Sequence, residues 1–303
     1  MKIIKGNFKN LNNEFDVAVA IGNFDGVHLG HQALIDKLLS FDNTLLKGII
    51  TFTPHTMQYF TKGNFQTIVT PSDKIDLFKK YPIDLFFEVE FDQEFASLEI
   101  SEMIEFLKSI NVKKIVIGSD WRFGKKGLGQ PKDLENDFDV YIVSDVYDNH
   151  QMVSSTLIKS LIVNGDLDNT RRLLNHPYLI TAEVIYGNQI GSTVLGFPTA
   201  NLDYDNLVLP PNGVYLTRVF HDDLEYFGMA NIGYNPTVNY SEAKKLEVNI
   251  FDFDQMIYGE EVKIEFLKWV RPEKKFNSKD ELINQLQKDQ NYIKKLSKTY
   301  KVW

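Results

Sequence analysis

The spacing of apolar residues changes near Tyr178, and this change constrains the fold more than any other feature of the chain. Before that point, short continuous apolar runs such as residues 17–21 alternate with stretches of helical periodicity. After it, apolar and polar residues alternate, as in residues 181–186 and 262–267. Continuous runs suit parallel strands buried on both faces, whereas alternation suits antiparallel strands with one buried face. The sequence therefore predicts two different folds in series.

The first half alternates strands with helices. Strands are expected at residues 17–21, 48–52, 83–89, 114–118 and 140–143. Ser72 and Ser101 are candidate N-caps of helices between these strands. Two further helices, at 156–163 and at 167–174 behind the capping residue Asp166, are expected to connect the two halves. The rhythm predicts a parallel, doubly wound sheet with residues 1–177 as one domain.

The second half reads as an antiparallel barrel or sandwich over residues 178–303. Its strands are expected at residues 181–186, 214–220, 246–251 and 262–267, separated by turns rich in Gly, Asn and Pro. Ser278 and Glu281 form a capping-box pattern ahead of an apolar periodic stretch. A terminal helix that packs on the strands is therefore predicted.

Composition excludes several classes of function. The 303 residues carry a formal net charge of −8, which argues against a nucleic-acid-coating protein. The absence of cysteine removes disulfides, thiolate nucleophiles and Cys-ligated metals, and the six histidines are too scattered for a metal cluster. No stretch approaches the roughly 18 apolar residues of a membrane span. We expect a cytoplasmic protein with neither nucleic acid nor membrane as partner.

The most informative segment is residues 22–31, GNFDGVHLGH, between the first buried strand and the first helix. The backbone N–H groups at such a junction, together with the helix dipole, favour an anion. Gly26 and Gly30 would allow a nucleotide to approach closely. His28 and His31 could donate hydrogen bonds to phosphate oxygens as pyrophosphate leaves. The alternative is a capping turn with two solvated histidines.

The whole segment resembles the nucleotidyltransferase signature of the bacterial bifunctional riboflavin kinase and FAD synthetase family. The resemblance implies a Rossmann-like nucleotidyltransferase domain in which His28 and His31 orient the ATP phosphates. Nucleotide contacts are then expected from the surrounding loop, at Asn23, Phe24, Gly26 and Gly30.

More of the family pattern follows in order, at residues 51–55, 118–124 and 154–156. Each segment lies at or just beyond a predicted carboxyl end of a strand, the edge where open α/β sheets collect ligands. The resemblance places Asp120 on the flavin or adenine side. It also implies that Ser155 and Thr156 hold phosphate from a helix N-terminus.

Three positions depart from the family pattern in this domain. Thr56 stands where a second proline is usual, and Trp121 follows Asp120 where the family has phenylalanine, which is a tolerated variation. Lys159 replaces the arginine that closes the third motif. A lysine is a point charge and cannot grip phosphate bidentately. We therefore expect Lys159 to contact the nucleotide and the activity to persist, with an affinity for ATP that differs from that of family members with arginine.

The second candidate site is GFPTANL at residues 196–202, followed by PPNGVY at 210–215. Hydroxyl and amide side chains beside a Pro-fixed turn can supply oxygen ligands for Mg²⁺ and donors to phosphates. The alternative is an ordinary turn containing Asn and Pro. With residues 231–237 and 246–253, these segments resemble the riboflavin kinase family.

That resemblance implies a β-barrel kinase domain with defined roles. Thr199 and Asn201 would meet Mg²⁺ and the ATP phosphates, and Glu247 would be the general base for the ribityl 5′-hydroxyl. Further contacts are implied for the nucleotide at Gly196 and Pro198, and for the flavin at Asn231. Without the family pattern, Glu247 would be a solvent-facing strand residue.

The kinase pattern is also imperfect. A basic Gly-Arg pair is usual ahead of GFPTAN, whereas this chain has GSTVL at residues 191–195, with Ser192 after the glycine. Asn249 stands where histidine is usual. The phosphate-facing loop could instead recruit Arg218 or another basic residue.

The sequence thus predicts a bifunctional enzyme that makes FMN from riboflavin and FAD from FMN. ATP is the co-substrate of both reactions and Mg²⁺ the cofactor. Two alternatives stay open, namely the same fold with one activity retained and a non-catalytic flavin-binding regulator. The oligomeric state, a homo-oligomer included, also stays open.

Overall fold

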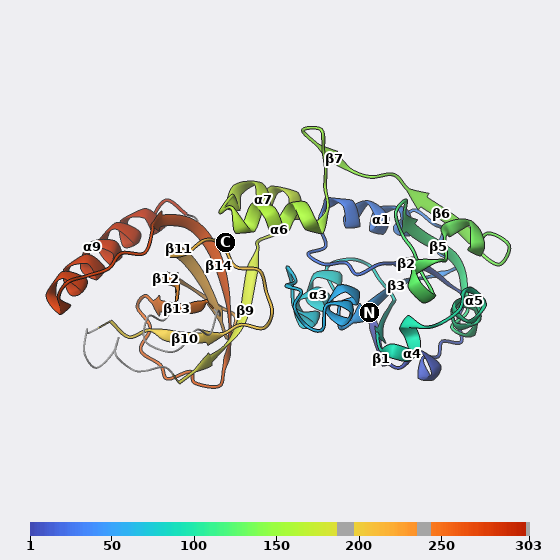
Figure 1. Cartoon of the computed structure of the whole chain (residues 1–303), viewed down its shortest axis with the longest axis horizontal. Helices are drawn as coiled ribbons and strands as arrows, with labels where there is room; N and C mark the ends of the chain where they lie inside the picture. Colours follow the sequence, from blue (N-terminus) through green and yellow to red (C-terminus); the bar gives the residue numbers. More distant parts are fainter. Residues whose placement is uncertain (187–196, 235–243, 301–303) are drawn as a thin grey trace. The chain divides into compact units, whose positions relative to one another are not determined.

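A computed structural model describes residues 1–186, 197–234 and 244–300, which form two compact units (Figure 1). The first comprises Met1–Ile158 with Leu173–Asn175, and the second Lys159–Arg172 with the chain from His176. Residues 159–172 thus group with the second unit although residues 173–175, which follow them in the chain, group with the first. The boundary between residues 177 and 178 therefore stays a prediction.

The first unit is built on a parallel sheet, as predicted, with six strands instead of the five expected. Its strands are β1 (Lys2–Gly6), β2 (Val17–Ile21), β3 (Leu46–Thr53), β4 (Leu85–Glu90), β5 (Val112–Gly118) and β6 (Asp139–Val143). They lie in the order β1-β4-β3-β2-β5-β6. A two-stranded sheet of β7 (Tyr147–Asp148) and β8 (Gln151–Met152) precedes the connecting helices.

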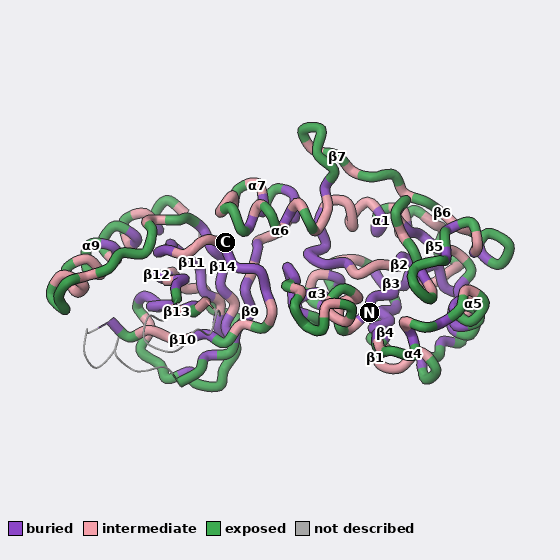
Figure 2. The backbone as a smooth tube through the Cα atoms, in the orientation of Figure 1, coloured by how far each residue is buried: buried purple, intermediate pink, exposed green. Residues whose placement is uncertain are grey.

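Helices cover both faces of this sheet, and Figure 2 shows its strands buried beneath more exposed helices. The α-helices are α1 (Leu29–Leu39), α2 (Thr56–Phe60), α3 (Pro71–Phe78), α4 (Gln93–Ala96) and α5 (Ile100–Ser109). Short 3₁₀ helices are η1 (Phe8–Asn10), η2 (Lys125–Gly127) and η3 (Pro131–Leu134). Alternate residues of β2 point to opposite faces, so Val19 packs with α5 and Ala20 packs with α1 and α3. This burial on both faces explains the continuous apolar run in the sequence.

Two predicted helix starts are wrong by two residues. Thr70, not Ser72, caps α3, because its hydroxyl accepts from the Asp73 amide at 3.1 Å. Pro71 then occupies the first helical position, where its fixed φ and missing N–H suit a helix start. Glu99, not Ser101, is the N-cap residue of α5. The connecting helices α6 (Ser155–Val163) and α7 (Leu167–Leu174) lie where they were expected.

The second unit contains a closed antiparallel barrel, which confirms the predicted fold. Its strands are β9 (Leu179–Ile185), β10 (Ala200–Asp203), β11 (Gly213–His221), β12 (Leu224–Gly233), β13 (Lys245–Ile250) and β14 (Glu261–Arg271). They close in the order β10-β13-β12-β11-β14-β9, with β9 pairing β10. Closure removes the unpaired edges that a sandwich would leave.

The terminal helix α9 (Lys279–Ser297) packs on the outside of the barrel, as predicted. Ser278 caps it by accepting from the Glu281 amide at 3.2 Å. Buried Ile293 joins a cluster with Val214 and Met229 of the barrel wall. Within the described ranges, none of the helices has the length and apolar character needed to cross a membrane.

Candidate active sites

The first candidate site lies where the strand order of the parallel sheet reverses. The chain passes from β2 to β3 on one side, while β5 pairs with β2 on the other. Open α/β sheets bind ligands at the carboxyl ends of strands at such a reversal. Residues 22–28 leave the carboxyl end of β2, and exposed Asp120 follows the end of β5. The topology therefore supports the location that the motifs predict.

His28 and His31 are held together at the start of α1. His28 is the N-cap residue, and its Nδ1 accepts from the His31 amide at 3.4 Å. The two rings stack with centroids 3.7 Å apart and planes 19° from parallel. A Cβ at Gly30 would lie 3.1 Å from the His28 ring and 3.1 Å from the Val153 carbonyl oxygen. A side chain at position 30 would therefore press on the imidazole pair and on this backbone oxygen.

Both imidazoles are neutral at pH 7. Burial lowers the pKa of His28 to about 4, although Asp25 acts in the opposite direction. The pKa of His31 is lowered well below its usual value, first by burial and then by nearby His28, Lys74 and His55. Because Nδ1 of neutral His28 accepts a hydrogen bond, its proton resides on Nε2. Each ring therefore acts as a hydrogen-bond donor without carrying a charge.

Lys74 is a charged residue of this site that the sequence analysis missed. It lies on α3, is only 6% exposed, and donates to the Thr51 hydroxyl at 3.2 Å. Burial lowers its pKa to about 8, while Asp25 and Glu88 act in the opposite direction. The lysine is still mainly charged at pH 7. The sequence contained one signal of this burial. Lys74 is adjacent to the apolar residue Ile75, so it lies close to the side of the helix that packs on the core.

The loop after β2 is tied to two other predicted segments. The Asn23 amide donates to the Thr56 hydroxyl at 3.0 Å, and the Thr56 backbone N–H donates to the Asn23 Oδ1 at 3.2 Å. A proline at position 56 could make neither bond. At the other side, the Ser155 hydroxyl donates to the Asp25 carbonyl at 2.9 Å. The structure thereby brings three sequence motifs together around one loop.

The remaining predicted residues of this site differ in exposure. Phe24 is fully buried, with its ring 5.2 Å from that of His31, so it supports the histidine from the core. Gly26 has a φ of +86°, and a Cβ there would meet Ile68 and Leu174 at 3.1 Å. Thr156 is exposed in the first turn of α6.

Lys159 lies about one turn farther along α6 than Ser155. It groups with the second compact unit. The nucleotide-binding roles of these residues, and of Asn23 and Asp120, stay predictions.

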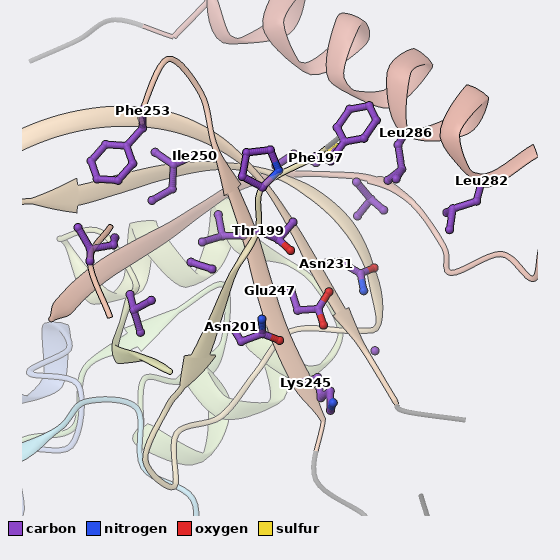
Figure 3. Close-up of a pocket in the computed structure, with 18 of the residues that line it drawn as sticks. Phe197, Thr199, Asn201, Asn231, Lys245, Glu247, Ile250, Phe253, Leu282 and Leu286 are labelled. Carbon is purple, nitrogen blue, oxygen red and sulfur yellow. The ribbon is translucent and has the colours of Figure 1, made fainter. Parts of the chain in front are cut away.

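The second candidate site is a cavity of about 870 Å³ on the outside of the barrel. Five predicted residues line it, namely Pro198, Thr199, Asn201, Asn231 and Glu247. Figure 3 shows Asn201, Asn231 and Glu247 on neighbouring strands, with Thr199 just before the first residue of β10. Gly196 and Ser192 lie outside the described residues. The structure thus unites residues that are far apart in the sequence.

The strand register explains how these side chains meet. Glu247 on β13 pairs with Asn201 on β10 and, on its other side, with Asn231 on β12. Residues directly opposite each other point to the same face of a sheet, so the carboxylate is flanked by two carboxamides. Burial raises the pKa of Glu247, and Lys245 acts in the opposite direction. Glu247 is therefore a stronger base than an exposed glutamate.

The basic residues of the cavity are Lys245, Arg271 and Lys274, which the sequence analysis did not identify. Arg271 is fixed by Asp289 of α9, whose Oδ2 accepts from its Nε at 2.8 Å and its Nη2 at 2.6 Å. Arg218 does not line this cavity. It is buried in ion pairs with Glu225 at 2.8 Å and Glu265 at 3.4 Å.

The neighbouring carboxylates thus hold the Arg218 guanidinium in the barrel wall. The phosphate-facing loop ahead of Gly196 lies outside the described residues, so the recruitment of Arg218 stays a prediction.

Apolar side chains make the rest of the cavity wall. Phe197 and Phe253 belong to segments that the motifs marked (Figure 3). No motif marked Tyr258, Phe276, Leu282 or Leu286. In the sequence, Leu282 and Leu286 are indistinguishable from residues that only pack α9 on the barrel. A flat aromatic ligand suits a wall of this composition.

Comparisons with known proteins match both halves of the chain. A family model described as FAD synthetase matches residues 11–157, and one described as riboflavin kinase matches residues 174–297. The chain is 36% identical over 283 residues to the bifunctional riboflavin kinase/FMN adenylyltransferase of Bacillus subtilis, with 89% of each chain covered. This chain belongs to the bifunctional riboflavin kinase/FMN adenylyltransferase family.

Another member of that family, from Escherichia coli K12, is 32% identical over 303 residues, with 96% of each chain covered. A crystal structure described as a macrolide-efflux protein from Streptococcus pneumoniae shares 33% identity and superposes with a TM-score of 0.83. It covers 97% of this chain and 99% of its own. The family resemblance seen in the motifs is thereby confirmed, and so is the two-part fold.

Proposed function

We propose that the barrel phosphorylates riboflavin at the cavity around Glu247 and that the parallel-sheet unit adenylylates FMN at the His28–His31 pair. The chain is a riboflavin kinase and an FMN adenylyltransferase. The observation that carries the residue assignment is the cross-strand row Asn201–Glu247–Asn231 inside one cavity. ATP and flavins are the substrates.

In the kinase reaction, Glu247 accepts the proton of the ribityl 5′-hydroxyl as its oxygen attacks the γ-phosphorus of ATP. A new O–P bond forms, the bond from the γ-phosphorus to the bridging oxygen breaks, and ADP leaves with that electron pair. Asn231 is next to the base and orients the flavin hydroxyls. Lys245 and Arg271 offer positive charge to the phosphates from the cavity wall.

The donors beside Glu247 suit a magnesium ion. Thr199 and Asn201 present a hydroxyl and an amide oxygen to the same cavity, and Mg²⁺ prefers oxygen ligands. Bound Mg²⁺ would neutralise the charge of the ATP phosphates. Thr199 and Asn201 would hold it, and the apolar wall would exclude water from the reacting groups.

The kinase assignment is tested by replacing Asn201 with alanine. We expect the Mg²⁺ concentration that gives half-maximal FMN formation to rise at least about tenfold, because one oxygen ligand is lost. FAD formation from supplied FMN should not change in the same preparation. An unaltered Mg²⁺ dependence of FMN formation would remove Asn201 from the site.

In the adenylyl transfer, a phosphate oxygen of FMN attacks the α-phosphorus of ATP. The bond between the α-phosphorus and the bridging oxygen breaks, and pyrophosphate leaves. His28 donates from Nε2–H to a phosphate oxygen, and His31 donates from its own N–H. Ser155 and Thr156, at the start of α6, and the loop glycines bind the nucleotide phosphates. Lys74 contributes the positive charge that neutral imidazoles lack.

Lys159→Arg tests whether α6 contacts the nucleotide beyond its first turn. An arginine can bind phosphate with two parallel hydrogen bonds where lysine offers a point charge. We expect the KM for ATP in FAD formation to fall about threefold or more. An unchanged KM would show that position 159 does not contact ATP.

Separate assays of the two half-reactions decide between the alternatives. A chain that retained only one activity would form either FMN or FAD, and a flavin-binding regulator would bind flavin without consuming ATP. We expect both products from the unmodified chain.

A further inference from the structure

Asn249 is a buried carboxamide that no assigned role explains. It is 4% exposed and follows Glu247 by two residues on β13, so both side chains point to the same face of the barrel wall. Its position opposite Met229 on β12 places it beside the cavity. A buried amide is costly unless both its donor and its acceptor have partners.

Both halves of this amide are used, and they bind different segments. The Asn249 Nδ2 donates to the carbonyl oxygen of Pro198 at 2.5 Å. Its Oδ1 accepts from the Gln290 Nε2 at 3.3 Å. One side chain thus joins β13 to the turn before β10 and to α9.

Each of these partners belongs to a segment that also lines the cavity. Pro198 is followed directly by Thr199, which presents its side chain there. Earlier turns of α9, before Gln290, supply Leu282 and Leu286 to the cavity wall. The Asn249 amide therefore fixes where the Thr199 segment lies relative to Glu247.

We infer that Asn249 is a positioning residue for riboflavin phosphorylation. By donating to the Pro198 carbonyl, it holds Thr199 at a set distance from the base two residues away. MgATP can then bind without a rearrangement of this turn, so less binding free energy is spent on ordering the turn. This inference rests on the proposed kinase function of the barrel.

Asn249→Asp is the discriminating variant because it keeps the shape and loses the donor. A carboxylate would face the Pro198 carbonyl without a hydrogen to offer, while still accepting from Gln290. We expect the KM for MgATP in FMN formation to rise about tenfold, the effect of one lost buried hydrogen bond. The KM for riboflavin should change less than about twofold on the same scale.

Asn284→Asp is the matched control, since it makes the same chemical change at an exposed position of α9. A second variant, Gln290→Glu, removes the donor to Asn249 and should raise the KM for MgATP by a smaller factor. Its control is Gln287→Glu on the exposed side of the same helix. Both controls should retain the unmodified KM values.

FAD formation from supplied FMN, in the same samples, reports the amount of intact parallel-sheet unit, and the melting temperature reports the folding of the barrel. Unchanged KM values for MgATP in Asn249→Asp would overturn the inference. So would equal rises in both KM values with a lower melting temperature, which is the signature of a merely structural residue. Failure of the unmodified chain to form FMN would instead refute the proposed kinase function.

Discussion

Asn201 on β10 and Glu247 on β13 lie directly opposite each other in the barrel wall, so that an amide neighbours a half-buried carboxylate. An amide can bind the carboxylate without neutralising its charge. Burial therefore dominates, and the pKa of Glu247 is raised. This pairing gives the kinase site a base whose pKa lies above that of an ordinary glutamate.

We predict an acid limb in the pH dependence of FMN formation. Glu247 must be deprotonated to accept the hydroxyl proton, and burial raises its pKa above the ordinary value of 4.5. The rate should therefore fall as the pH drops through this raised pKa. The measurement is kcat/KM for riboflavin between about pH 4.5 and 8. An acid limb centred at or below 4.5 would contradict this role for Glu247.

A second pH effect concerns the stability of the parallel-sheet unit. The pKa of His28 is lowered from 6.5 to about 4 in the folded chain. Between these values, the unfolded state binds more protons than the folded state, so the free energy of unfolding rises with pH. The contribution of His28 to the free energy of unfolding is fully present above about pH 6.5 and is lost as the pH falls towards 4. It amounts to about 3 kcal/mol, at 1.36 kcal/mol for each pH unit between the two pKa values.

His28→Asn tests this effect because asparagine can still cap α1 but cannot titrate. Urea unfolding of both proteins at pH 7.5 and pH 4.5 gives the required comparison. We expect the variant to lose less stability on acidification than the unmodified chain. Equal losses would show that His28 is not held neutral by burial.

Gly30→Ala should disrupt the imidazole pair. The new Cβ would lie 3.1 Å from the His28 ring and 3.1 Å from the backbone oxygen of Val153, and only the ring can move easily. We expect about 1–3 kcal/mol of destabilisation and a marked loss of FAD formation. A Cβ at Gly22 meets the Phe24 ring only at 3.5 Å, so Gly22→Ala should destabilise less. Equal effects of the two substitutions would refute this steric account.

Asp289→Asn should loosen α9 from the kinase cavity. Asp289 accepts two bonds from Arg271, and removing its charge leaves that guanidinium without a counter-charge. Breaking such a largely buried pair costs about 3 kcal/mol. We expect a lower melting temperature and a higher KM for riboflavin. Asp252→Asn, which breaks an exposed ion pair with Lys294, should leave both values unchanged.

The sequence was sufficient for features that depend on neighbouring residues. Continuous runs gave the buried strands, His28 and Ser278 lay at helix starts, and motif order placed Glu247 and Asn201 in one domain. Strand β1 (Lys2–Gly6) escaped notice because it is a short edge strand with mainly exposed residues. Its pairing with β4 becomes visible only in the folded sheet.

Other features depend on contacts between distant segments. Lys74 reaches Thr51 only because α3 packs on the sheet beside β3, and Arg271 meets Asp289 only because α9 folds back on the barrel. Local periodicity contains no information about either contact. The position of Asn249 between Pro198 and Gln290 likewise required the barrel register.

We propose that two independent sites carry the two reactions. A chromatographic assay of Glu247→Gln and His28→Asn, each given riboflavin or FMN with ATP and Mg²⁺, tests this independence. Glu247→Gln should lose FMN formation by a factor of about 100 or more and still convert supplied FMN to FAD. His28→Asn should convert riboflavin to FMN and stop there. Loss of both products in either variant, or the reverse pattern, would contradict the account.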